Sequence, residues 1–202
     1  MSTHPAFPRR DYAGLIFDCD GTLADSMPIH YLAWRETMDR YGIEFSEPRF
    51  YALGGMPSDK IVATLSVEQN VAIDPARAAR EKEQAFLVRM HQLLPIEPVI
   101  AVARHFRGQR PMAVASGGYR AVILEQLEQI GCGGWFNAIV TAEDTPRHKP
   151  EPDVFLLAAE RLGVPATHCL VYEDSDLGLR AAAAAGMDVI DVRHFHTPRR
   201  WT

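Results

Sequence analysis

Residues 14–22 read GLIFDCDGT, so that a short apolar run passes directly into a turn carrying Asp18 and Asp20. Apolar runs of this length are typical of strands buried on both faces of a parallel sheet. Ligands of open α/β sheets bind beyond the carboxyl ends of the strands, which is where both aspartates stand. Gly21 permits the chain to turn, so that the two carboxylates can face one ligand. The segment therefore predicts the first strand of an α/β sheet with a reactive site directly after it.

Similar apolar runs recur farther along the chain and alternate with helical patterns. Strands are predicted at 111–115, 138–140, 169–172 and 189–192, and helices at 119–130, 153–162 and 177–185. A glycine follows each of these helices and is a common C-terminal stop. The alternation predicts a doubly wound α/β domain built on a parallel sheet.

The interval between the first two strands is too long for one crossover helix, at about ninety residues. Amphipathic patterns predict helices at 29–41, 58–67 and 75–94, and a further helix at 97–107 that returns the chain to the sheet. We therefore expect a small α-helical cap at 27–94, inserted into a catalytic core formed by 11–26 and 95–202.

Composition limits the kinds of partner. The 202 residues are 47% hydrophobic and 23% charged, with a net charge of −5 and no basic stripe, so neither nucleic acid nor membrane is expected as a partner. The first ten residues lack the apolar segment of a signal peptide and are expected to form a loose leader. An odd number of cysteines, three, favours a reducing cytoplasm. The oligomeric state stays open, and a monomer is compatible with this composition.

Polar residues follow the other predicted strands in the same way, and together they indicate phosphoryl transfer. They are Ser116, Lys149, Glu173 and Asp174. Asp18 is the predicted nucleophile, because a carboxylate can form an acyl phosphate and so divide one difficult displacement into two. Asp20 is predicted to protonate the leaving alcohol and then to take a proton from water. Lys149 is predicted to offset the negative charge of the nucleophile and the phosphoryl group.

Two anions repel each other, so a carboxylate that attacks a phosphate needs a cation nearby. Mg²⁺ prefers hard oxygen ligands, and we expect Asp18, the carbonyl of Asp20 and Asp174 to hold it, with Glu173 close by. Hydrogen bonds to the phosphate are expected from the main chain and side chains of a separate set of residues, namely Thr22, Ser116 and Gly117.

Four segments resemble the ordered motifs of the haloacid dehalogenase-like (HAD) superfamily. They are Asp18-Cys19-Asp20-Gly21-Thr22, Val114-Ala115-Ser116, Lys149-Pro150-Glu151-Pro152-Asp153 and Glu173-Asp174-Ser175-Asp176. The resemblance implies a Rossmann-like core, a helical cap, Mg²⁺ and an aspartyl-phosphate intermediate. Asp25-Ser26, His30 and Trp34 are similar to the branch that holds β-phosphoglucomutase and small sugar phosphatases. The chain resembles most closely bacterial phosphatases of fructose 1-phosphate and 6-phosphogluconate.

The cap departs from the mutase pattern. Where that enzyme carries a lysine and a phosphate-gripping arginine, the stretch 53–60 has Gly54 and Ser58. His30 and Lys60 are candidate substrate contacts, whereas Lys82, like Arg80, is expected to be solvated. Arg120 is compatible with either role, a contact to the substrate or a solvated side chain.

The resulting prediction is a Mg²⁺-dependent phosphatase acting on a small phosphorylated sugar in the cytoplasm. A β-phosphoglucomutase-like isomerase is the alternative, which the missing cap cations disfavour. A 2-haloacid dehalogenase would not need Asp20 or the metal, and a purely regulatory sugar-phosphate binder would not need every catalytic position filled.

Overall fold

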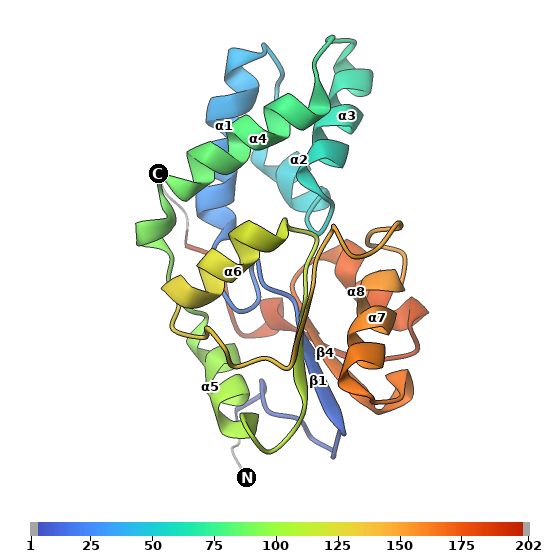
Figure 1. The fold of residues 1–202 in the computed structure, drawn as a ribbon. Helices are drawn as coiled ribbons and strands as arrows, with labels where there is room; N and C mark the ends of the chain where they lie inside the picture. The colour runs from blue at the N-terminus through green and yellow to red at the C-terminus, as the bar shows by residue number, and fades with distance from the viewer. Residues whose placement is uncertain (1–3, 200–202) are drawn as a thin grey trace.

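The computed structural model describes residues 4–199. Its centre is a parallel sheet with strand order β3-β2-β1-β4-β5 (Figure 1). The strands are β1 (Gly14–Phe17), β2 (Met112–Ala115), β3 (Ala138–Val140), β4 (Cys169–Glu173) and β5 (Asp188–Asp191). The predicted doubly wound, Rossmann-like α/β fold is confirmed. Because β1 lies between β2 and β4, the turn after β1 stands at the middle of the sheet edge, next to the ends of both neighbours.

The helices divide into a group around the sheet and a group beyond one end of it (Figure 1). The first group is α5 (Glu97–Phe106), α6 (Arg120–Gln129), α7 (Asp153–Leu162) and α8 (Asp176–Ala184). The second is α1 (Met27–Arg40), α2 (Glu47–Ala52), α3 (Ser58–Gln69) and α4 (Pro75–Leu87). Short 3₁₀ turns lie at Met90–Gln92, Ala166–His168 and Val192–His194. The predicted boundaries of the cap at 27 and 94 stay a prediction.

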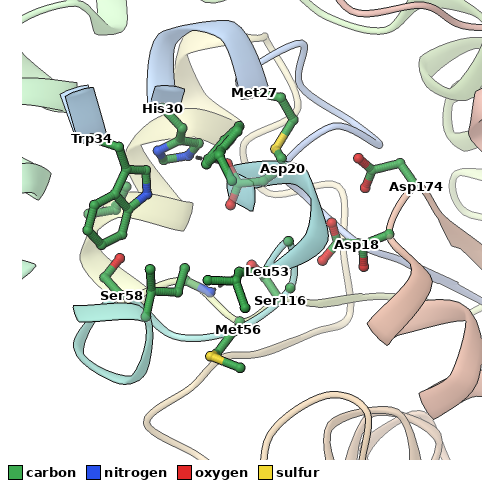
Figure 2. Close-up of a pocket in the computed structure, with 18 of the residues that line it drawn as sticks. Asp18, Asp20, Met27, His30, Trp34, Leu53, Met56, Ser58, Ser116 and Asp174 are labelled. Atoms are coloured by element: carbon green, nitrogen blue, oxygen red, sulfur yellow. Dashed lines mark hydrogen bonds and ion pairs between the residues drawn. The ribbon is translucent and has the colours of Figure 1, made fainter. Parts of the chain in front are cut away.

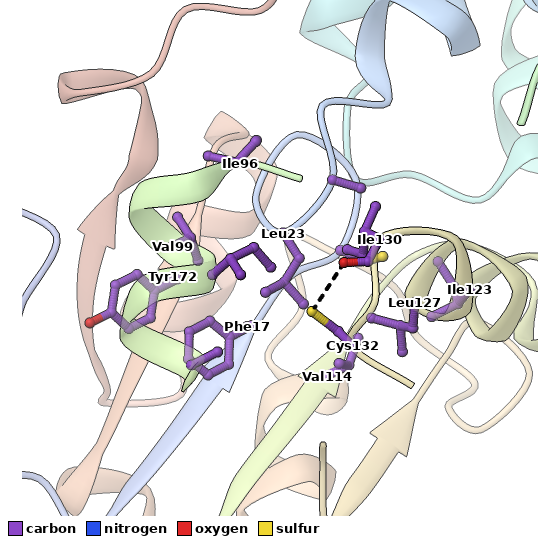
Figure 3. Close-up of a cluster of buried hydrophobic side chains, with 14 of the residues drawn as sticks. Phe17, Leu23, Ile96, Val99, Val114, Ile123, Leu127, Ile130, Cys132 and Tyr172 are labelled. Carbon is purple, nitrogen blue, oxygen red and sulfur yellow. Dashed lines mark hydrogen bonds between the residues drawn. The ribbon is translucent and has the colours of Figure 1, made fainter. Parts of the chain in front are cut away.

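Alternation along β1 explains the layers around the sheet. Leu15 and Phe17 belong to the buried cluster formed with α5 and α6, whereas Ile16 belongs to the cluster formed with α7 and α8. Successive residues of a strand point to opposite faces, so each face of β1 receives its own layer of helices. Figure 3 shows the first cluster, in which Phe17 and Tyr172 lie side by side, with ring centroids 4.8 Å apart. These two packed layers hold the end of β1 rigidly under the site.

The helices α1 to α4 have a hydrophobic core of their own. Trp34 and Met38 of α1 pack with Phe50 of α2 and with Ile61 and Leu65 of α3. All five side chains are almost fully buried. Helices α1 and α4 also contribute to the cluster formed with α5 and α6, through Ile29, Ala33, Ala85 and Phe86, so this group of helices is packed against the core as well as around its own interior.

The helices of the structure differ from the predicted helices at two places. The predicted helix 75–94 ends at Leu87, and the buried Met90 and Leu93 reach the core from a 3₁₀ turn. Apolar spacing thus continues across the break, which is why periodicity alone overestimated the length. The short α2 was not predicted, although Ser46 caps it by accepting a hydrogen bond from the Arg49 amide.

The N-terminal leader was also wrongly predicted to be loose, as far as residues 4–10 are concerned; residues 1–3 lie outside the described part. Ala6 is completely buried, and its carbonyl accepts a 2.8 Å hydrogen bond from the Tyr172 hydroxyl. The buried hydroxyl of Tyr172 needs a hydrogen-bond partner, and the Ala6 carbonyl of the leader provides one.

Candidate active site

The predicted nucleophile lies at the centre of a buried ionic group. Asp18 follows β1 directly, and its amide donates to the Tyr172 carbonyl of β4 at 3.0 Å. Lys149 donates to Asp18 Oδ1 and to Glu173 Oε2, each at 2.7 Å, and all three side chains are nearly inaccessible to solvent. One ammonium therefore joins the ends of β1 and β4 from the loop that precedes α7.

Burial and charge act on this group in opposite directions. Burial raises the pKa of Asp18 to about 8, with Glu173 and Asp20 adding to the rise and Lys149 opposing it. Burial lowers the pKa of Lys149, but the two carboxylates outweigh burial and raise it above its usual value. Lys149 therefore stays charged, and Asp18 has excess negative neighbours that a further cation would stabilise.

A metal fits this surplus of carboxylates. Oxygen atoms of Asp18, Glu173 and Asp174 lie within 4.8 Å of one another. Burial raises the pKa of Asp174 well above its ordinary value, and the charges of Glu173 and Asp18 add to this rise. Three hard oxygen donors that destabilise one another as anions are the donor set that Mg²⁺ prefers. The Asp20 carboxylate is outside this group, so its predicted contribution stays that of a main-chain carbonyl.

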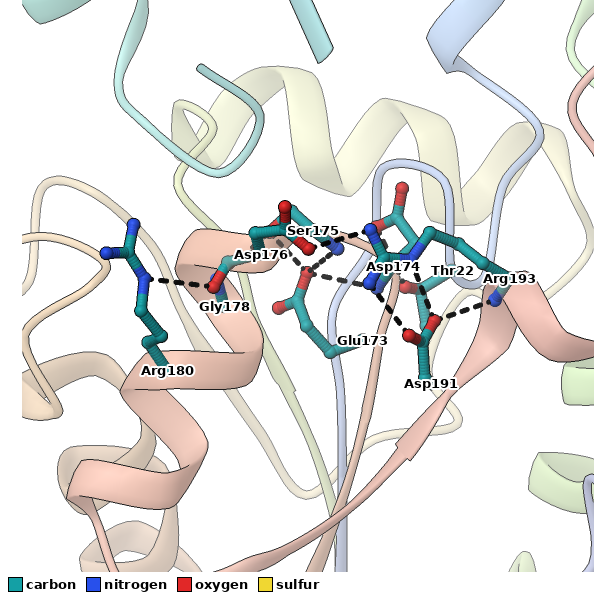
Figure 4. Close-up of polar contacts among 9 residues, drawn as sticks. All are labelled: Thr22, Glu173, Asp174, Ser175, Asp176, Gly178, Arg180, Asp191 and Arg193. Atoms are coloured by element: carbon teal, nitrogen blue, oxygen red, sulfur yellow. Dashed lines mark hydrogen bonds and ion pairs between the residues drawn. The ribbon is translucent and has the colours of Figure 1, made fainter. Parts of the chain in front are cut away.

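The loop after β4 holds Glu173 in place (Figure 4). Glu173 Oε1 accepts hydrogen bonds from the Ser175 amide at 2.9 Å and from its hydroxyl at 2.8 Å. Thr22 donates to Asp174 Oδ1 at 3.3 Å. Gly21 has a φ of +76°, and a Cβ there would lie 2.1 Å from Asp174 Oδ2. The turn after β1 thus requires glycine both for its backbone angle and for the approach of Asp174.

Asp20 is held by a second, separate set of contacts. Its Oδ1 lies 2.7 Å from both the Ser26 hydroxyl and His30 Nε2. On the other side of the ring, Lys82 Nζ lies 2.9 Å from His30 Nδ1. An ammonium has only protons to donate, so Nδ1 accepts and Nε2 carries the proton given to Asp20. Lys82 of α4 thereby sets the tautomer of His30 on α1.

These contacts decide the ionisation of Asp20. Burial raises the pKa of Asp20, but the hydrogen bonds from His30 and from the Ser26 hydroxyl outweigh burial and hold the pKa below its usual range. The sequence left open whether neighbouring charges would raise or lower this pKa. The structure presents Asp20 as an ionised carboxylate, which is the form that accepts a proton.

The cap touches the core beside Ser116. A Cβ on Gly117 would lie only 2.4 Å from the carbonyl oxygen of Gly55, in the loop between α2 and α3. Ser116 accepts a 3.0 Å hydrogen bond from the Gly118 amide, and both Ser116 and Gly117 line the cavity between cap and core. The close approach of two glycines lets the cap loop cover the strand ends.

A model of the haloacid dehalogenase-like hydrolase family matches residues 12–186. The chain belongs to this family. Fructose-1-phosphate phosphatase YqaB of Escherichia coli (strain K12) is 44% identical over 184 residues, which cover 90% of this chain and 97% of that protein. The resemblance inferred from the four motifs is confirmed, and so is the expectation of a hydrolase.

Two solved structures share the fold. A hydrolase from Pseudomonas syringae superposes with a TM-score of 0.82 and 26% identity, covering 92% of this chain and 87% of its own. A β-phosphoglucomutase from Clostridium difficile superposes with a TM-score of 0.80 over 89% of this chain and 84% of its own. At 22% identity, the second likeness concerns the fold alone.

The structure brings most of the predicted site residues of this HAD-like hydrolase to one cavity. Its lining includes Asp18, Asp20, His30, Ser116, Gly117, Glu173 and Asp174 (Figure 2). Thr22 lies behind Asp174, and Lys149 lies beneath the carboxylates. Lys60 is not among the lining residues: its side chain is exposed and pairs with Asp59 at 3.6 Å.

Lys82, and not Lys60, is the lysine that lines the cavity. It was expected to be solvated, but it is 3% exposed and lines the cavity together with the neighbouring Glu83. Ala78 and Phe86 stand one helical turn before and after it and are fully buried. This spacing places Lys82 on the buried face of α4, a signal that helical periodicity could have supplied.

Arg120 has a structural role. Its guanidinium donates to Asp144 at 2.6 Å and to the Ile139 carbonyl at 3.1 Å, on the side of α6 next to β3. Trp34 belongs to the core of the cap, as expected, and also lines the cavity.

Proposed function

We propose that this HAD-like hydrolase is a Mg²⁺-dependent sugar-phosphate phosphatase that acts through an aspartyl-phosphate intermediate. The observation that carries the proposal is the placement of Asp18, a buried carboxylate at a strand end with Lys149 bonded to it. Similarity to a fructose-1-phosphate phosphatase supports a small phosphorylated sugar as the substrate. Fructose 1-phosphate and 6-phosphogluconate are the first candidates, and a cytoplasmic location remains part of the proposal.

In the first step, Asp18 attacks phosphorus while Lys149 stabilises the negative charge that gathers there. The Ser116 hydroxyl and the amides of the neighbouring glycines line the cavity, where they can donate to phosphate oxygens. Arrival of a dianionic phosphate raises the pKa of Asp20 by like-charge repulsion, which lets Asp20 carry the proton that the leaving sugar oxygen receives.

In the second step, Asp20 takes a proton from the water that hydrolyses the acyl phosphate. Asp20 is ionised at this point because it gave its proton to the sugar oxygen in the first step, and the Ser26 and His30 contacts orient it. Mg²⁺, held by Asp18, Asp174 and the Asp20 carbonyl, would neutralise the repulsion between the carboxylates and the phosphate. His30 and Lys82 act through Asp20 and are positioning residues.

A mutase must hold a second phosphate in the cap, and the described cap offers little charge for it. Gly54 and Ser58 stand at the positions of the mutase cations, and the one lysine among the described lining residues, Lys82, already bonds His30 and Glu83. This pairing favours hydrolysis over isomerisation.

A panel of sugar phosphates assayed for phosphate release in Mg²⁺ tests the proposal. We expect the wild type to release phosphate from at least one small monophosphate, and Asp18→Asn to lose at least about a thousandfold of kcat because no nucleophile remains. Circular dichroism would check that the variant is folded. Wild-type turnover to a rearranged sugar phosphate without free phosphate would favour the mutase, and turnover retained by folded Asp18→Asn would end the nucleophile assignment.

A further inference from the structure

The end of the cavity remote from the nucleophile carries a carboxylate. Figure 2 shows Ser58 on the far side of the cavity from Asp18 and Asp174. Ser58 donates a 2.6 Å hydrogen bond to Glu83 Oε1, and Glu83 also lines the cavity. The remote end is therefore formed by cap helices α3 and α4 and bears a negative group.

The contacts of Glu83 leave one oxygen available. Oε1 accepts from Ser58 and from Lys82 Nζ at 3.2 Å, whereas Oε2 has no partner among the described residues. The side chain is 13% exposed, and Glu83 is one of the residues that line the cavity. Burial raises the pKa of Glu83, but the charge of Lys82 and the Ser58 hydrogen bond outweigh burial and keep the carboxyl ionised.

The positive charge nearest to Glu83, the Lys82 ammonium, is already hydrogen-bonded within the protein. The Lys82 ammonium divides its hydrogen bonds between His30 Nδ1 and Glu83, so it offsets the Glu83 charge and adds little attraction for a further anion. The surrounding Trp34 and Ile61 are apolar, which lowers the local dielectric and strengthens any repulsion between like charges.

We propose that Glu83 selects substrates whose end remote from the phosphate is a neutral polyol and disfavours substrates with a second anionic group there. Sugar hydroxyls can donate to the available Oε2, whereas a carboxylate or second phosphate meets a like charge with no unpaired cation beside it. The inference rests on the proposed phosphatase function and narrows it: fructose 1-phosphate is preferred over 6-phosphogluconate and over fructose 1,6-bisphosphate.

The test compares kcat/KM for fructose 1-phosphate with kcat/KM for each of the two substrates that carry a second anionic group, 6-phosphogluconate and fructose 1,6-bisphosphate. Glu83→Gln keeps the hydrogen-bonding shape and removes the charge, so we expect the preference for fructose 1-phosphate to fall by roughly tenfold. Glu81→Gln is the matched control on the same helix, because Glu81 pairs with Arg77 outside the cavity and should leave the preference unchanged.

The ratio separates selection from general damage. Loss of the Glu83 contact to Lys82 can disturb His30 and Asp20, but such a change lowers kcat for all substrates and cancels in the ratio. A wild type that prefers the substrates with a second anion, or an unchanged ratio in folded Glu83→Gln, overturns the inference. No phosphate release by the wild type from any sugar phosphate would instead overturn the proposed function.

Discussion

The ionisation of each aspartate at this site depends on the side chain that contacts it. Asp18 and Asp20 are two residues apart, yet Lys149 bonds the first and His30 bonds the second. Burial raises the pKa of Asp18, whereas hydrogen bonding from His30 and Ser26 lowers that of Asp20 despite burial. Two carboxyls with different environments can take different roles, one as nucleophile and one as proton carrier.

Replacing His30 should separate these roles. In His30→Gln we expect kcat to fall by about tenfold to a hundredfold, with a smaller change in KM, because Asp20 loses its orienting partner. The pKa of Asp20 is depressed in the wild type, so losing His30 raises it. The acidic limb of the pH–kcat profile should therefore move to higher pH.

Steady-state kinetics between about pH 4 and 8 would check both effects, with His168→Gln as the control because His168 is exposed and distant in the fold. A variant with lower kcat but an unmoved acidic limb would argue that His30 only packs against its neighbours.

At the scale of elements, close approach between loops determines closure of the cap. Gly117→Ala places a methyl group 2.4 Å from the Gly55 carbonyl oxygen, so the cap loop must shift away from the strand ends. We expect kcat/KM for sugar phosphates to fall by at least about tenfold while the free energy of unfolding changes by less than about 1 kcal/mol, because the contact joins loops and not cores. Kinetics and urea denaturation would measure the two quantities, and wild-type kcat/KM in the variant would contradict the role of this contact.

A group of hydrogen bonds centred on Asp144 joins α6, the end of β3 and α7. Asp144 accepts hydrogen bonds from Arg120, Arg161 and the amide and hydroxyl of Thr141, at 2.6–2.8 Å. Although burial raises the pKa of Asp144, these donors outweigh it and hold the pKa below the usual value of 3.8. We expect Asp144→Asn to lose about 1–3 kcal/mol of stability at neutral pH.

The stability that Asp144 contributes depends on pH, and the direction follows from the difference between its folded and unfolded pKa values. A depressed folded-state pKa contributes stability above the unfolded value and loses it as pH falls through the folded value. The stability gap between wild type and Asp144→Asn should therefore be constant near neutrality and shrink below about pH 4. Denaturant melts at several pH values would measure it, with exposed Glu151→Gln as the control; a gap that widens on acidification would contradict this account.

At the scale of the molecule, the helices of the cap and the carboxyl ends of the strands enclose a cavity lined with carboxylates. The cap has its own apolar core, and the sheet with its helices has two more. Every helix among residues 4–199 is too short or too polar to span a bilayer. A molecule that enters this cavity meets side chains of the cap and the carboxylate cluster at the same time.

Adding Mg²⁺ should stabilise the whole molecule. A cation that binds the folded carboxylate cluster and not the unfolded chain raises Tm by mass action. We expect a higher Tm in Mg²⁺ than in EDTA, and loss of this difference in Asp174→Asn, which removes one charged ligand. Differential scanning fluorimetry needs no substrate; an equal Mg²⁺ effect in the variant would place the ion elsewhere.

Much of the fold and the core of the site could be predicted locally. The strand β1 and the turn after it are encoded in nine consecutive residues, and in a parallel sheet the carboxyl ends must meet at one edge. That geometry is enough to bring Asp18, Lys149 and Asp174 together without knowing any packing detail. The helix expected at 75–94 was too long because apolar spacing does not distinguish an α-helix from a helix followed by a 3₁₀ turn.

The cap residues show where local reasoning ends. Helical periodicity could have placed Lys82 on the buried face of α4, but only the packing of α4 against α1 brings it beside His30. The GLIFDCDGT segment by itself determined a buried strand, the turn after it and the position of the proposed nucleophile, since each depends on neighbours in the chain. Tertiary structure alone decided the ionisation of Asp20 and the charge at the remote end of the cavity, because both depend on side chains that sequence places far apart and folding brings within hydrogen-bond distance.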